Sequence, residues 1–151
     1  DFFYREMESD NRRNKTILIA HGWLGMGDHW LKIGEFLADC GFHVLIPDMP
    51  NHGRSFHTDD FSYEEIALFL HDFVERKKIS EMPILIGHSM GGKLIMKMAD
   101  LFPNEYEKQH LAPCSSNTHC RLHHQQRKDT LPPGRKGSRL HLHKNAAQPI
   151  V

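Results

Sequence analysis

Short apolar runs alternate with helical patterns along the first two thirds of this chain. Runs of mainly apolar, β-prone residues occur at 16–20, 42–46 and 83–86. Segments with apolar side chains at helical spacing follow them, at 29–39, after Ser62 and at 90–102. Apolar runs of this kind are typical of strands that are buried on both faces. The repeated order of strand and helix therefore predicts an α/β fold, with a mostly parallel sheet flanked by helices.

Local signals indicate where the helices begin and end. Asp28 is expected to cap the first helix and Gly41 to end it. Ser62 and Glu65 form a capping box for the second helix. Residues 1–6 are a candidate for the end of an earlier strand. The first helix is predicted to bury one apolar stripe, made of Trp30, Ile33, Phe36 and Leu37.

The composition changes abruptly near residue 109. Residues 1–108 hold 12 basic and 18 acidic side chains, whereas residues 109–151 hold 7 basic side chains and one acid, Asp129. All 14 aromatic residues lie in the first part. So few apolar groups with a net positive charge do not offset the entropy cost of ordering. We therefore expect residues 1–108 to form the domain and residues 109–151 to be a basic, disordered tail without strands.

The composition also excludes several classes of protein. The 151 residues carry 19 basic and 19 acidic side chains, which argues against a dedicated nucleic-acid binder. No apolar run approaches the roughly 18–20 residues needed to cross a bilayer, so no integral membrane segment is expected. The spacing of Cys114 and Cys120 among histidines matches no zinc module, and we expect no bound metal.

The pentapeptide Gly87-His88-Ser89-Met90-Gly91 carries the clearest chemical signal. It lies between an apolar strand and an amphipathic helix, which is the setting of a nucleophile elbow. Such a turn is tight, so the residues two before and two after the serine must lack bulky side chains. Ser89 is then expected to project its hydroxyl above the sheet edge, beside a helix N-terminus that favours negative charge. We interpret Ser89 as a candidate nucleophile, against the alternative of an incidental serine in a glycine-rich turn.

A second glycine-rich motif, His21-Gly22-Trp23-Leu24-Gly25, follows the first predicted strand. A tetrahedral oxyanion needs at least two hydrogen-bond donors, each worth roughly 10²–10³ in rate. Gly22 allows the loop to turn a backbone N–H toward a reacting carbonyl. The amides of Trp23 and Met90 are therefore the candidate donors, and His21 is interpreted as structural rather than catalytic.

A third loop, residues 48–55, is expected to be structural, with Asp48 paired to Arg54. In their order and spacing, the three motifs resemble the α/β-hydrolase fold superfamily over about residues 4–108, especially its esterase- and lipase-like members with a G-H-S-M-G-G elbow. The resemblance implies that Ser89 is the nucleophile, that Trp23 and Met90 are the oxyanion donors, and that no cofactor is needed. It implies a small-molecule ester or acyl substrate. Because esterases, thioesterases and acyltransferases share these motifs, the acyl acceptor stays open.

The chain also departs from that superfamily, in which an acid and then a histidine follow the nucleophile on later strands. Asp129 followed by His141 or His143 preserves this order, but no predicted strand positions them. We therefore predict a partial α/β-hydrolase fold that lacks the C-terminal strands. The truncated chain is expected to be poorly active, because a serine without a base is a poor nucleophile. The alternative is a non-catalytic, hydrolase-like protein that binds an acyl ligand or regulates a full-length relative.

Overall fold

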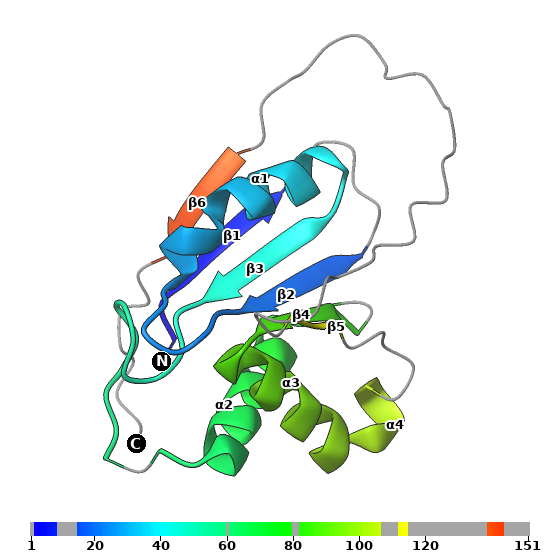
Figure 1. Ribbon diagram of the computed structural model, residues 1–151. Helices are drawn as coiled ribbons and strands as arrows, with labels where there is room; N and C mark the ends of the chain where they lie inside the picture. The colour runs from blue at the N-terminus through cyan, green and yellow to red at the C-terminus, as the bar shows by residue number, and fades with distance from the viewer. Residues whose placement is uncertain are drawn as a thin grey trace, which may run out of the picture.

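The computed structural model describes residues 2–8, 15–59, 61–79, 82–106, 112–114 and 139–143. These residues form a six-stranded sheet in the order β5-β4-β2-β3-β1-β6 (Figure 1). The strands are β1 (Tyr4–Glu8), β2 (Thr16–Ala20), β3 (His43–Pro47), β4 (Ile84–His88), β5 (Ala112–Cys114) and β6 (Arg139–His143). Strands β2 to β5 run parallel, while β1 is antiparallel to both β3 and β6. The predicted α/β fold with a mostly parallel sheet is confirmed.

Helices cover both faces of the sheet (Figure 1). On one face, the 3₁₀ helix η1 (Gly27–Trp30) leads into α1 (Leu31–Asp39); on the other lie α2 (Tyr63–Arg76) and α3 (Met90–Leu101), and α4 (Pro103–Tyr106) follows α3. Successive strand side chains point to opposite faces. In β2, Leu18 therefore packs with α2 and α3, while Ile17 and Ile19 join the core beside α1. None of the described helices combines the length and apolar character needed to cross a membrane.

The predicted helix signals around α2 and the end of α1 are confirmed. Ser62 caps α2, because its hydroxyl oxygen accepts the Glu65 N–H at 3.1 Å. Gly41 adopts a φ of 93° just after α1 and donates its N–H to the Ala38 carbonyl at 2.8 Å. The face of α2 that packs on the sheet is buried, and its members are Ile66, Leu70, Phe73 and Val74.

The start of α1 differs from the prediction. Asp28 lies within η1 and accepts a hydrogen bond from Arg5 Nε at 2.7 Å. The residue that precedes α1 is Trp30, and it makes no side-chain cap. Arg5, on the distant strand β1, therefore binds the Asp28 carboxylate that the local sequence predicted to cap the first helix.

The predicted apolar stripe of α1 is also wrong in part. Ile33 is 46% and Phe36 is 66% exposed, whereas Trp30 and Leu37 pack against the core. The reason is Gly34, which faces the sheet so closely that a Cβ there would lie 2.8 Å from Ile46 Cδ1. Because α1 packs against the sheet at Gly34, the large side chains of Ile33 and Phe36 point away from the sheet.

The prediction that no strand follows residue 108 is wrong for two short segments. Strand β5 pairs in parallel with β4, and β6 pairs antiparallel with β1. Both lie at an edge of the sheet, where main-chain N–H and C=O groups are available for pairing. Backbone pairing needs no apolar run, so the hydrophobic pattern did not indicate it. The remainder of the predicted tail, with Asp129 and Cys120, lies outside the described residues.

Candidate active site

Ser89 lies at the sharp junction between β4 and α3. Its φ of 52° and ψ of −112° fall outside the regions that L residues usually occupy. The residue is exposed at the carboxyl end of β4. Met90 is the first residue of α3, so the N–H groups of the first helical turn lie beside the serine and favour negative charge there.

Two glycines make this junction possible. A Cβ at Gly87 would lie 2.6 Å from the carbonyl carbon of Gly91, and a Cβ at Gly91 would lie 2.1 Å from the Ala20 carbonyl oxygen. Both neighbours are backbone atoms, so no side-chain rotation relieves the clash. The close approach of α3 to the ends of β2 and β4 therefore depends on glycine at both positions.

The loop between β2 and η1 lies against the same turn. A Cβ at Gly22 would lie 2.7 Å from His88 Nδ1, so the glycine packs directly on the residue before Ser89. Within the described residues, no hydrogen bond occupies the N–H of Trp23 or of Met90. The two segments that meet at this turn therefore each carry a backbone N–H without a hydrogen-bond partner among the described residues.

His21 is buried beneath this loop with both ring nitrogens engaged. Its Nδ1 lies 2.8 Å from the Gly22 carbonyl oxygen, and its Nε2 accepts the Met49 N–H at 2.9 Å. These partners require the neutral tautomer that carries its proton on Nδ1. Burial also lowers the pKa of His21 below its usual 6.5. A ring held in this way has no free position for proton transfer, which agrees with the structural interpretation.

Asp48 organises the loop that follows β3, but its partners differ from the prediction. The buried carboxylate accepts the N–H groups of Gly27 at 2.7 Å and of Arg54 at 2.9 Å. Its ion-pair partner is Arg5, while the Arg54 guanidinium lies 4.9 Å from the centre of the Phe3 ring. The expected pairing of the Asp48 and Arg54 side chains is therefore wrong. No local pattern indicates the true pair, because 43 residues separate its members.

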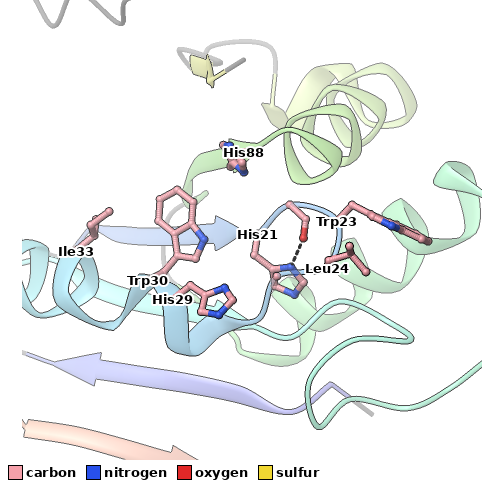
Figure 2. Close-up of a pocket in the computed structure, with 9 residues that line it drawn as sticks. His21, Trp23, Leu24, His29, Trp30, Ile33 and His88 are labelled. Atoms are coloured by element: carbon pink, nitrogen blue, oxygen red, sulfur yellow. Dashed lines mark hydrogen bonds between the residues drawn. The ribbon is translucent and has the colours of Figure 1, made fainter. Parts of the chain in front are cut away.

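A cleft of about 370 Å³ opens beside the turn (Figure 2). Its lining comes from the β2–η1 loop, η1, α1 and the end of β4: His21, Gly22, Trp23, Leu24, Gly25, His29, Trp30, Ile33 and His88. This volume suits a small molecule. Ser89 is not part of the lining, although its neighbour His88 is. Sequence reasoning did not assign Trp30 or Ile33 to a site, because helical spacing does not distinguish the wall of a cleft from a core.

The partners of a catalytic serine are not assembled in the described part of the chain. No histidine there is hydrogen-bonded to the Ser89 hydroxyl. His141 and His143 belong to β6, which lies four strand positions from β4 in the sheet, a separation of about 19 Å. The sheet order therefore does not bring β6 to the serine.

Among the residues that the structure describes, two groups of side chains have ligand atoms close enough to share a metal ion. They are Glu6–Glu8–His43 and His71–Glu75–Glu105. In the first, the Glu6 carboxylate is already bound to His43 at 2.7 Å and to Lys77 at 2.9 Å. Neither group lines the cleft, so neither belongs to the candidate active site.

A protein-family model described as the alpha/beta hydrolase fold matches residues 15–108. The chain belongs to the α/β-hydrolase family. A curated relative, an AB hydrolase superfamily protein of Gibberella zeae, is 28% identical over 102 residues, which are 68% of this chain and 35% of the relative. Lipase 3 of a Moraxella species is 31% identical over 100 residues, 65% of this chain and 31% of the lipase.

Solved structures agree with this membership. A marine microorganism esterase has 39% sequence identity and a TM-score of 0.63, over 70% of this chain and 38% of the esterase. The expected family and partial hydrolase fold are thereby confirmed. This α/β hydrolase chain spans about a third of the length of the curated relatives it matches.

Proposed function

We propose that this α/β hydrolase acts on carboxylic esters or thioesters with Ser89 as the nucleophile. The observation that carries the proposal is the strained backbone of Ser89, with a φ of 52° between β4 and α3. Strain of this kind persists only where the surrounding structure enforces it, and it clusters at functional sites. Here it holds a hydroxyl in an exposed position at the start of a helix.

In the proposed reaction, Ser89 Oγ attacks the carbonyl carbon and its proton passes to a histidine base. The negative charge that develops on the carbonyl oxygen is stabilised by the N–H groups of Trp23 and Met90. The alcohol or thiol leaves with a proton from the base, and water then releases the acyl group from the serine. The chemistry assigned to these residues requires no cofactor.

Two further observations support an ester substrate. The cleft beside the turn is lined by aromatic and apolar side chains such as Trp30 and Ile33, which suit the carbon chain of an acyl or alcohol group. Relatives that match the chain carry the names lipase and esterase. Membership of the fold does not by itself decide the substrate, so the site geometry carries the argument.

We expect the 151-residue chain alone to be a slow catalyst. Its Ser89 hydroxyl has no histidine partner among the described residues, and an unactivated serine stays protonated at neutral pH. Loss of a triad member leaves only the residual rate that comes from binding and from the oxyanion donors.

A fluorophosphonate probe tests the proposal directly. We expect slow but specific phosphonylation of the purified chain, mapped by mass spectrometry to Ser89 and abolished in Ser89→Ala. Ser62→Ala removes another exposed serine and is the matched control, which should label as the wild type does. Rapid labelling would contradict only the expectation of slow catalysis.

Labelling that persists in Ser89→Ala, or a complete absence of labelling, would contradict Ser89 as nucleophile. Absence would favour the second candidate, a non-catalytic hydrolase-like protein that binds an acyl ligand or regulates a relative. The missing hydrogen bond between a described histidine and Ser89 is the observation that favours this second candidate.

A further inference from the structure

Two donors hold the carbonyl oxygen of Gly22. The Nδ1–H of His21 donates to it over 2.8 Å, as the dashed line in Figure 2 shows, and the Gly25 N–H donates over 3.0 Å. The imidazole is anchored on its other side, where Nε2 accepts the Met49 N–H at 2.9 Å. The Gly22 carbonyl is therefore fixed both from its own loop and, through the ring, from the loop after β3.

The Gly22 carbonyl and the Trp23 N–H belong to one peptide unit. No peptide bond in the described residues is cis, so the C=O and N–H of this unit point in opposite directions. Fixing the oxygen therefore fixes the direction of the N–H. Hydrogen bonds to the carbonyl also polarise the amide, which strengthens its N–H as a donor.

We propose that His21 is a positioning residue that orients and polarises the Trp23 N–H toward an oxyanion formed at Ser89. This inference rests on the proposed function, because it concerns an oxyanion donor of that reaction. The relay runs from the Met49 N–H through the imidazole to the Gly22 carbonyl, and from there to the Trp23 N–H. His21 touches no substrate and transfers no proton.

The relay requires a neutral ring. A protonated imidazole would turn an Nε2–H toward the Met49 N–H and set two donors against each other. Burial is the main cause that lowers the pKa of His21, and the charges of His52 and Arg5 lower it further, against the opposing effects of the hydrogen bond to Gly22 and of the Asp48 carboxylate. The His52 ring lies 5.3 Å away between centres. The donor–acceptor form of His21 is therefore maintained near neutral pH.

Two substitutions separate the relay from simple packing. His21→Asn keeps an amide donor where Nδ1 stood, whereas His21→Gln keeps an acceptor where Nε2 stood and loses the donor to Gly22. Glutamine is the larger of the two, so a packing role predicts that His21→Gln is the less disturbed variant. The relay predicts instead that the Trp23 amide is less disturbed in His21→Asn than in His21→Gln.

The first readout does not depend on reactivity. In the isotope-labelled full chain, NMR should show His21 as the Nδ1–H tautomer. The Trp23 amide resonance should move less in His21→Asn than in His21→Gln, with thermal unfolding recorded to show that both variants fold. An Nε2–H tautomer, or a Trp23 resonance that moves at least as far in His21→Asn, would overturn the relay.

The second readout is the rate of fluorophosphonate labelling at Ser89. We expect His21→Gln to label about tenfold more slowly and His21→Asn within about threefold of the wild type, because displacing an oxyanion donor costs less than the roughly 10²–10³ lost on removing it. Equal rates in the two variants would overturn the inference. If the wild-type chain does not label at Ser89, the proposed function fails. The relative shifts of the Trp23 amide resonance in the two variants then decide whether His21 orients that amide.

Discussion

Arg5 is a buried cation that pairs with carboxylates from other segments of the chain. Its side chain is fully buried in β1 and pairs with Asp28, at 2.7 Å, and with Asp48. Asp48 in turn accepts the N–H groups of Gly27 and Arg54. One guanidinium therefore connects β1 to η1, which lines part of the cleft, and to the loop that follows β3.

Replacing this guanidinium should be costly. We expect Arg5→Met to lower the free energy of unfolding by about 3–5 kcal/mol, because it leaves the Asp48 carboxylate buried without its counter-ion. Urea denaturation followed by circular dichroism measures the loss. Arg54→Met is the matched control, since Arg54 serves Asp48 through its backbone N–H, and should cost less than about 1 kcal/mol. Similar losses in the two variants would show that the buried Arg5–Asp48 pair is not what stabilises this part of the fold.

Among the elements, the start of α3 is positioned by a contact between backbones. Its first turn lies so close to β2 that Gly91 has no room for a Cβ beside the Ala20 carbonyl oxygen. Buried side chains further along the helix, such as Leu94 and Met98, then join the core with α2. The orientation of Ser89 at the start of α3 follows from this close approach.

The substitution Gly91→Ala tests that approach. Alanine is the better helix former by about 1 kcal/mol, so propensity alone predicts a more stable protein. We expect the reverse, a loss of about 1–3 kcal/mol, because the new methyl group overpacks against the backbone of β2. Thermal unfolding gives the sign, and Met96→Ala, at an exposed position of the same helix, should change stability by less than about 1 kcal/mol. A stabilised Gly91→Ala variant would mean that α3 does not lie so close to the strand.

At the scale of the whole molecule, one polar network joins three strands and a helix. Glu6 of β1 bonds His43 of β3 at 2.7 Å, and Lys77 just after α2 reaches the same carboxylate at 2.9 Å. Thr16 at the start of β2 lies 3.1 Å from the other ring nitrogen of His43. Burial alone would raise the pKa of Glu6, but the hydrogen bonds and charges of His43 and Lys77 outweigh it and lower the pKa to about 2.

Because of this network, the free energy of unfolding depends on pH in the acidic range. A carboxyl group whose pKa falls from 4.5 when unfolded to about 2 when folded stabilises the protein above pH 4.5. That contribution, about 3 kcal/mol, is lost as the pH falls through this window, because the unfolded chain binds the proton first. Glu6→Gln should remove this part of the pH dependence of urea unfolding. Glu35→Gln, at an exposed position on α1, should leave it in place, and an unchanged profile in Glu6→Gln would exclude the network as its cause.

Local pattern was sufficient for the order of strands and helices, the cap at Ser62 and the glycine-flanked turn around Ser89. Each of these depends on residues close together in the chain, where apolar period and steric limits operate directly. The motif residues Trp23 and Met90 could be nominated for the same reason, as parts of glycine-relaxed loops at strand ends.

Only the tertiary structure decided which face α1 buries, that Arg5 rather than Arg54 pairs with Asp48, and that short edge strands extend the sheet. It also decided that His21 holds the peptide that carries the Trp23 N–H. These features join residues far apart in the chain, and their energies depend on distances and burial that arise after the elements pack. The spacing of apolar residues along the chain predicts which side chains are buried. It does not predict which distant polar group will pair with each buried charge or imidazole.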